Sequence, residues 1–293
     1  MRQDVEFESD GERCAAWLYL PESGKSAPVI VMAHGLGGIR TMRLDAFAER
    51  YCAEGYACLV FDYRHFGDSS GQPRQLLSIR RQLEDWKNSV ECARRCSGVD
   101  GSKVIVWGTS FSGGHVLRTA ATVPNIAGVM AQCSFTNGLA SSTTLPPLSR
   151  LKVAALAFAD VLTMPLRKTP VMVDLAGYPG APALMATQDA VEGTERLKPA
   201  DSDIPGSVAA RVGLAITTYS PGRSASRISC PALVIACLKD TVAPVERTLK
   251  YGTQLREGEV VEFDAAHFDI YLGDWFEKTV AIQIDWLKRH FPL

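Results

Sequence analysis

The sequence lacks any apolar run long enough to cross a bilayer, and it lacks runs of one charge. Its longest apolar stretches have the length of strands, well short of the roughly 20 residues that a membrane-spanning helix needs. Lysine and arginine are scattered, the formal net charge is -1 and the pI is about 6.5. These features favour neither nucleic acid nor an anionic membrane as a partner. Because residues 1–20 hold no signal-like apolar segment, we expect a soluble, cytoplasmic protein.

Paired cysteine motifs are also absent, although the chain has eight cysteines. None lies in a C-x-x-C pair, and most stand among apolar residues, where free cysteine behaves as a small hydrophobic side chain. Cys92 and Cys96 are four residues apart but have no set of further ligands around them. We therefore expect free thiols and no metal site.

Short apolar runs alternate with helical patterns along most of the chain. Strands buried on both faces of a parallel sheet have this nearly continuous apolar character. Residues 5–8 and 15–20 alternate instead, as an antiparallel hairpin at the edge of a sheet does. The pattern predicts an α/β protein with a mostly parallel, doubly wound sheet. The runs that we expect to be buried strands are 29–33, 57–61, 104–107, 127–131 and 233–237.

The alternation stops between residues 138 and 223. This stretch holds nine of the sixteen prolines and an apolar helical segment at 148–166. It is too long for a connecting loop. Because strand patterns resume after it, we expect an inserted helical cap (138–223) on a core formed by 1–137 and 224–293, rather than a second independent domain.

A serine stands at the turn between a strand pattern and a helix pattern. The segment GTSFSGG (108–114) places Ser110 where an α/β sheet ends and a ligand binds. The turn needs small neighbours because the serine backbone there is strained. Gly108 fits, whereas Ser112 stands where the common G-x-S-x-G motif has glycine. Either serine could instead cap the helix, but the spacing from Gly108 favours Ser110 as the nucleophile.

A serine hydroxyl needs an adjacent base, and the sequence has only five histidines. His267 follows the last strand pattern, at 260–264, and Asp240 follows the strand pattern at 233–237. The chain order serine, acid, histidine is that of a nucleophile–acid–base triad. Asp240 could also serve as a turn or capping residue, and both roles are compatible. Asp269 is too near His267 in sequence, so we expect it to be structural.

Two further loops follow strands at the same edge. The glycine-rich HGLGG (34–38) lets backbone amides approach a ligand, and we expect Leu36 and Phe111 to donate to an oxyanion, with Gly37 as a substitute for Leu36. We expect His34 to orient this loop. In DYRHFGDS (62–69) we expect an Asp62–Arg64 network with a scaffolding role.

The motifs HGLGG, FDYRHFGDSSG (61–71), GTSFSGG, LKDTVAP (238–244) and HFDIY (267–271) resemble the α/β-hydrolase superfamily. They are more similar to its branch of X-prolyl dipeptidyl-peptidases and dienelactone hydrolases, and to fungal polyketide transferases. The resemblance implies an α/β-hydrolase fold with an eight-stranded sheet and Ser110, Asp240 and His267 as catalytic residues. It implies no metal or organic cofactor and does not define the substrate.

Together these features predict a serine hydrolase that cleaves an ester or thioester of a lipophilic acyl group. We expect the small-molecule acyl substrate to contact the apolar cap residues Leu148, Phe158, Leu162 and Met164, although these could instead pack the cap on the core. One alternative is transfer of a polyketide acyl group from an acyl carrier protein to an alcohol. Another is a hydrolase-fold binder that has lost its chemistry. The sequence does not indicate the oligomeric state.

Overall fold

The computed structural model describes residues 1–22, 24–166 and 169–293. Within these residues one sheet has eight strands in the order β1-β2-β4-β3-β5-β6-β10-β11. All neighbours from β4 to β11 pair in parallel, whereas β2 pairs antiparallel with β1 and β4. The mostly parallel sheet with an antiparallel hairpin at its edge is confirmed. Its strands are β1 (Arg2–Ser9), β2 (Glu12–Tyr19), β3 (Ala27–Ala33), β4 (Ala57–Phe61), β5 (Val99–Thr109), β6 (Gly128–Gln132), β10 (Ala232–Cys237) and β11 (Gly258–Phe263).

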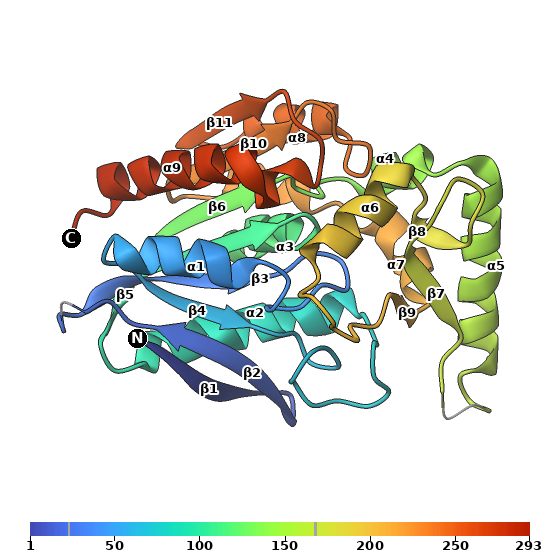
Figure 1. Ribbon diagram of the computed structural model, residues 1–293, viewed down its shortest axis with the longest axis horizontal. Coiled ribbons are helices and arrows are strands. Elements are labelled where there is room, and N and C mark those ends of the chain that lie inside the picture. The colour runs from blue at the N-terminus through green and yellow to red at the C-terminus, as the bar shows by residue number, and fades with distance from the viewer. Residues whose placement is uncertain (23, 167–168) are drawn as a thin grey trace.

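Helices cover both faces of this sheet. In Figure 1, α1 and α9 lie in front of it and contact each other, while α2 and α3 pack on each other behind it. Every residue of β3 and β10 is buried, as strands covered on two faces require. In the described part of the chain, each helix is too short or too polar to cross a bilayer. The helices of the core are α1 (Leu44–Ala53), α2 (Ile79–Arg95), α3 (Phe111–Ala120), α8 (Val245–Gly252) and α9 (Gly273–His290), with short 3-10 turns η1 (Pro221–Arg227) and η2 (Asp269–Tyr271).

The cysteines are free thiols, as expected. Most of them contribute to the packing of strands or helices rather than to a reactive site. Burial raises the pKa of the Cys133 thiol to about 12 and raises that of Cys230 to about 11. These thiols therefore stay protonated and behave as small apolar side chains.

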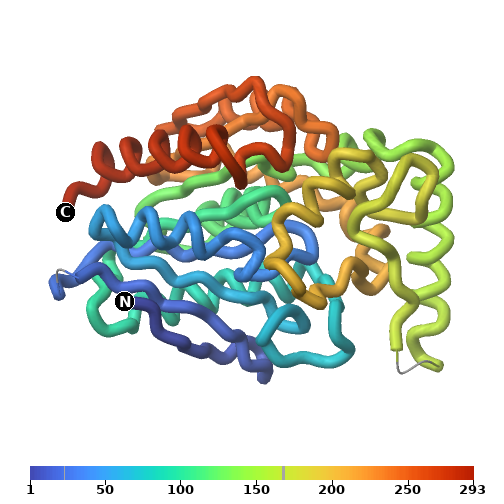
Figure 2. Tube along the Cα trace, viewed as in Figure 1, coloured from blue at the N-terminus to red at the C-terminus, as the bar shows by residue number. Residues whose placement is uncertain are grey.

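The elements between β6 and η1 form a separate layer at one end of the molecule. Figure 2 shows the chain leaving the sheet in green, forming this layer in yellow and returning to the sheet in orange. The layer was expected to be helical, but it also contains a three-stranded sheet in the order β8-β7-β9. Because these strands have only three to five residues, they leave no readable periodicity. The elements are α4 (Gly138–Thr144), α5 (Pro147–Thr163), β7 (Met172–Ala176), β8 (Ala183–Met185), α6 (Gln188–Leu197), β9 (Ser207–Ala209) and α7 (Val212–Thr218).

Candidate active site

Ser110 occupies the sharp turn between β5 and α3. Its backbone has φ 55° and ψ −121°, a conformation that L residues rarely adopt. One neighbouring segment holds this strain in place: the Ser110 N–H donates to the carbonyl of Gln132 at 3.0 Å, and the Ser110 carbonyl accepts from the N–H of Phe135 at 2.9 Å. The turn is therefore anchored to the end of β6, and strain of this kind gathers at functional sites.

Glycine is needed at three positions in and beside this turn because neighbouring atoms leave no room for a Cβ atom. A Cβ atom on Gly108 would lie 2.3 Å from the carbonyl oxygen of Ser112. A Cβ on Gly114 would lie 2.2 Å from the carbonyl oxygen of Phe135, and one on Gly35, from the loop after β3, would lie 2.8 Å from the Ser110 Cβ. The close approach of these three segments around Ser110 thus depends on glycine.

Ser112, which stands where the common motif has glycine, has a hydrogen-bond partner for its side chain. The Ser112 Oγ lies 2.9 Å from the hydroxyl of Tyr63, and that hydroxyl accepts a hydrogen bond from Trp86 Nε1 at 2.8 Å. All three side chains are buried. Ser112 therefore belongs to a buried polar network on the α2 side of the turn, and Ser110 is the serine that faces the cavity described below.

Three distant segments meet at Ser110. The Ser110 Oγ lies 3.0 Å from Nε2 of His267, and Nδ1 of His267 lies 2.6 Å from Oδ2 of Asp240. Asp240 also accepts the backbone N–H groups of Val242 and Ala243 through its other oxygen, at 2.8 and 2.7 Å. Asp240 is thus both a turn residue and the partner of the imidazole. With Nδ1 facing Asp240, Nε2 faces the Ser110 hydroxyl, which is the geometry that proton transfer from a serine to a histidine needs.

Asp269, expected to be structural, does not contact the imidazole in this arrangement. Its carboxylate accepts the backbone N–H of Ala266 at 2.8 Å and so closes the turn before His267.

His34 stabilises the glycine-rich loop through hydrogen bonds at both of its ring nitrogens. Its Nε2 donates to the carbonyl of Met42 at 3.0 Å, and its Nδ1 accepts the N–H of Gly35 at 2.8 Å. Burial lowers the pKa of His34 to about 4, so the ring is neutral at neutral pH. Both ring nitrogens are therefore used within the loop, which is the orienting role expected for this residue.

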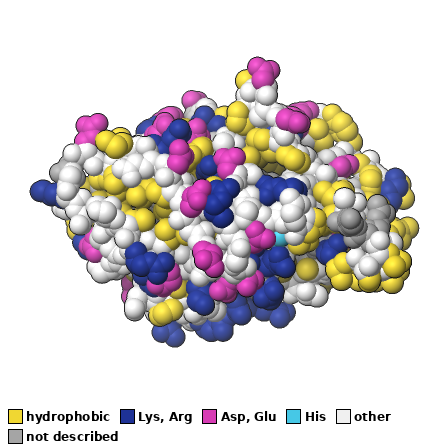
Figure 3. All heavy atoms as spheres, turned by 90° about the horizontal axis from the view of Figure 1, so that it is seen from below, with side chains coloured by type: hydrophobic (Ala, Val, Ile, Leu, Met, Phe, Trp, Pro, Cys, Tyr) yellow, Lys and Arg dark blue, Asp and Glu magenta, His cyan; other side chains and the backbone are white. Residues whose placement is uncertain are grey.

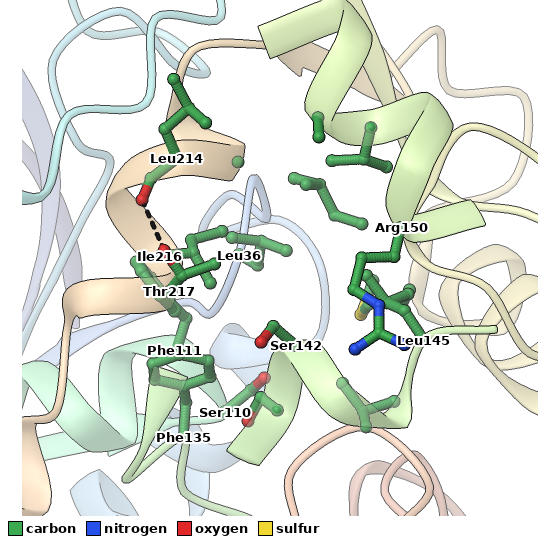
Figure 4. A pocket seen from close by; sticks show the side chains of 17 residues that line it. Leu36, Ser110, Phe111, Phe135, Ser142, Leu145, Arg150, Leu214, Ile216 and Thr217 are labelled. Atoms are coloured by element: carbon green, nitrogen blue, oxygen red, sulfur yellow. Dashed lines mark hydrogen bonds between the residues drawn. The ribbon is translucent and has the colours of Figure 1, made fainter. Parts of the chain in front are cut away.

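An apolar cavity of about 140 Å³ opens on Ser110. Figure 4 shows Ser110 at one end of it, with α5 on one side and α7 on the other. Leu36 and Phe111, the expected oxyanion donors, both border it. The core also contributes Phe135 and Val242. The cavity is lined from the cap by Ser141, Ser142, Leu145, Arg150, Val153, Ala154, Leu184, Met185, Gly213, Leu214, Ile216 and Thr217.

The cap residues expected to bind substrate do not line this cavity. Leu148, Phe158, Leu162 and Met164 are each more than half exposed on the outer side of the cap. The expectation was wrong because α5 is apolar on both faces. Apolar character marks this helix as part of the cap but does not tell which face is inside.

Phe135 and Val242 were missed by the sequence analysis, although each had a signal. Phe135 follows β6 at the same edge of the sheet as Ser110, and Val242 follows Asp240 by two residues. A residue at the carboxyl end of a parallel strand is a candidate for ligand contact in this class of fold. The inner residues of α7 had no comparable signal.

The expected Asp62–Arg64 network is also wrong. Asp62 pairs with Arg40 from the loop after β3, whereas Arg64 pairs with Asp85 of α2 at 2.6 Å. Asp62 also accepts the backbone N–H of Arg40 at 2.7 Å, and the backbone N–H of Arg64 donates to Asp85 at 3.1 Å, so the two residues of this turn have different partners. Both pairs are buried, and they tie the turn to the loop after β3 and to α2.

A second, smaller cavity of about 40 Å³ lies on the other side of Ser110. It is bordered by His267, by the glycine-rich loop and by α6 of the cap. Thr194 of α6 faces it, and the Thr194 hydroxyl is buried without a hydrogen-bond partner among the described residues. Ser110 and Leu36 border both cavities, so a reacting carbonyl at Ser110 would have one space on each side.

The fold and the order of these residues define an α/β hydrolase. The model of the alpha/beta hydrolase family matches residues 28–282, and the chain belongs to that family. The expected family and fold are thereby confirmed.

Two relatives and one solved structure are similar to this chain over nearly its whole length. The chain is 51% identical over 290 residues to the quorum-quenching protein AidA of Acinetobacter baumannii, covering 99% of this chain and 95% of the relative. It is 26% identical to the polyketide transferase ATR5 of Stachybotrys chlorohalonatus, covering 98% and 97%. Among solved structures, the alpha/beta hydrolase GrgF from Penicillium has a TM-score of 0.86 at 24% identity, with full coverage of both chains.

Proposed function

We propose that this protein is a serine hydrolase that cleaves an ester or thioester bond of a lipophilic acyl group. The observation that carries the proposal is the continuous hydrogen-bonded series Ser110–His267–Asp240 at the mouth of an apolar cavity. A hydroxyl, a base and an orienting carboxylate in this geometry are the parts that acyl transfer needs.

In the proposed reaction the Ser110 Oγ attacks the acyl carbonyl and its proton passes to His267 Nε2. The backbone N–H groups of Leu36 and Phe111 stabilise the oxyanion, an effect worth roughly 3 kcal/mol per donor. His267 then donates the proton to the departing alcohol or thiol as the bond to it breaks. Water attacks the acyl-enzyme, gives a proton to His267 and releases the acid, and that proton returns to Ser110.

The two cavities suggest how the substrate lies. We assign the acyl chain to the larger, apolar cavity and the leaving group to the smaller one beside His267. Residues 138–223 then act as a cap, because most of the larger cavity's lining comes from this stretch. AidA, the relative that is 51% identical, is named a quorum-quenching protein, so we propose a lipophilic signal ester or lactone as the substrate.

The test is a series of p-nitrophenyl esters of increasing acyl length, with the wild type and Ser110→Ala. We expect cleavage by the wild type and a loss of at least about 10³-fold in kcat/KM for Ser110→Ala. Ser112→Ala is the matched control, since it removes the other serine of the same turn, and it should keep activity within about tenfold of wild type. Equal rates for wild type and Ser110→Ala would remove Ser110 from the mechanism.

Two further assays separate the alternatives. Incubation with an acyl thioester and an alcohol should give the free acid; a new ester as the main product would identify an acyltransferase instead. Acyl lactones treated with the wild type, but not with Ser110→Ala, should no longer activate a quorum-sensing reporter strain. Activation that persists would exclude lactone signals as substrates while leaving the ester assay as the test of the hydrolase.

A further inference from the structure

The outer face of α5 carries a regular apolar stripe. Its members, which we call the α5 stripe, are all exposed and follow one another at intervals of three, four, three and four residues. This is the spacing of the a and d positions along the contact line of two packed helices. The α5 stripe consists of Leu148, Leu151, Ala155, Phe158 and Leu162.

The exposed charges of α5, Arg150 and Lys152, lie near its start. Between residues 153 and 166 the sequence has a single charged residue, Asp160. Its carboxylate is buried on the inner side of α5, where Arg211 donates to it at 2.6 and 3.0 Å. Burial alone would raise the pKa of Asp160, but the hydrogen bonds from Arg211 lower it below the ordinary value. The ion pair therefore fixes the orientation of the helix and keeps the one charge of residues 153–166 away from the outer face.

The exposed apolar area is large enough for a stable contact. Leu148, Leu151, Phe158 and Leu162 are 54%, 67%, 57% and 73% exposed, and Met164 and Leu166 extend the patch. With roughly 150–200 Å² for each fully exposed side chain of this size, the patch presents on the order of 700 Å². A monomer's largest apolar patch is about 300–600 Å², and a standard interface buries about 800 Å² per partner. Figure 3 shows hydrophobic side chains gathered at this end of the molecule.

We propose that two copies of this chain associate through the α5 stripe as a two-fold symmetric helix pair. A symmetric pair requires a surface that is complementary to itself, and an apolar stripe with helix-pairing spacing meets that requirement. The small Ala155 at its centre lets two helices approach closely, with larger side chains on both sides of it.

A membrane surface suits this helix less well. Helices that lie on membranes combine an apolar face with a polar face rich in lysine and arginine. The face of α5 opposite the stripe is occupied by the cap and the cavity, where Val153 and Ala157 are buried. The basic residues of α5, Arg150 and Lys152, are confined to its first two turns, and Lys152 donates to the carbonyl of Gly180 at 2.8 Å.

Dimerisation through the α5 stripe would also affect the larger cavity beside Ser110. The inner face of α5 contributes Arg150, Val153 and Ala154 to the larger cavity. A partner packed on the outer face would hold this wall of the cavity in place without contributing a residue to it.

The test is the mass of the full-length protein in solution across a dilution series, by sedimentation or light scattering. We expect about twice the chain mass of 31.8 kDa. Leu151→Glu/Phe158→Glu and Leu151→Lys/Phe158→Lys should each be monomers, with association weakened at least about 100-fold. Because opposite charges attract, an equimolar mixture of these two variants should recover dimers. Leu293→Glu, at the end opposite the cap, is the matched control and should remain dimeric.

Unchanged helical circular dichroism and melting would show that the variants fold. A wild type that is monomeric at every concentration overturns the proposal, as does a dimer that both double variants leave intact. Sedimentation of a monomeric wild type with neutral or anionic lipid vesicles would overturn it in favour of a membrane surface. This test uses no catalytic readout, so it is independent of the hydrolase assays.

Discussion

The core and the cap place their functional residues by different means. In the core, Ser110, Asp240 and His267 each follow a parallel strand, and the sheet brings the three strand ends to one edge. In the cap, short strands and helices pack on one another, and α5 presents apolar side chains to the cavity and to the surface alike. The core thus positions the proposed catalytic residues through backbone geometry, whereas the cap shapes the proposed acyl cavity through side-chain packing.

The largest effect should come from the core. Asp240→Asn keeps the shape of the residue but no longer favours the tautomer of His267 that leaves Nε2 free to accept a proton. We expect kcat/KM for a p-nitrophenyl ester to fall by about 10³–10⁴-fold. Asp269→Asn, two residues from the same histidine, is the matched control and should stay within about tenfold of wild type. Similar losses in both variants would mean that the imidazole is not oriented by Asp240.

A large effect on stability is expected in the cap. Asp160→Ala leaves Arg211 without its buried partner, and loss of one member of a buried pair costs about 3–5 kcal/mol. Urea unfolding should show this loss, and proteolysis should cut within 138–223 before the core. Arg289→Ala, which breaks two exposed ion pairs, should change the stability little. An Asp160→Ala protein as stable as the wild type would show that this ion pair does not hold α5.

A pH effect links the two regions through His115 of α3. Its ring contacts the Tyr219 hydroxyl from the cap at 2.7 Å and Gln82 at 3.0 Å, and burial lowers the pKa of His115 to about 3. Below about pH 6.5, His115 is protonated in the unfolded chain but stays neutral in the folded chain. The free energy of unfolding therefore falls as the pH is lowered. Between pH 6.5 and 5 the expected loss from this residue is about 2 kcal/mol.

The check is the free energy of unfolding measured over that pH range. His115→Gln removes the titrating group, so its stability should depend on pH less steeply than that of the wild type. His34, whose pKa is also lowered by burial, keeps part of the dependence in both proteins. Parallel pH curves for wild type and His115→Gln would contradict the account of His115.

The smallest effect should distinguish the two faces of α5. Ala154 borders the larger cavity, whereas the adjacent Ala155 is exposed. Ala154→Leu should reduce cleavage of long-chain esters relative to short ones by about tenfold, since a few methylene groups in an apolar pocket are worth 1–3 kcal/mol. Ala155→Leu should leave the chain-length profile unchanged. The reverse result would mean that the acyl chain does not occupy this cavity.

Much of the core was predictable from the sequence because its signals are local. Continuous apolar strands predicted most of the sheet, and Ser110, Asp240 and His267 were chosen because each follows a strand pattern in the chain order serine, acid, histidine. The partners of Asp62 and Arg64 were not predictable, since Arg40 and Asp85 come from other segments and no pattern points to them.

The cap was predicted less well for a physical reason. Its extent was inferred from proline content and length. The boundaries at residues 138 and 223 remain a proposal. Its short strands have no periodicity, and the two apolar faces of α5 are equivalent in the sequence. Only packing on the core, through pairs such as Asp160 with Arg211, decides that Phe158 faces outward and Val153 inward.

The most direct test of the central claim is covalent labelling with a fluorophosphonate, followed by peptide mass spectrometry. An activated serine attacks this reagent, so the wild type should carry one adduct on Ser110, and Ser110→Ala and His267→Ala should carry none. A folded wild type that takes up no label, or that takes it up on another residue such as Ser112, would contradict the proposed mechanism.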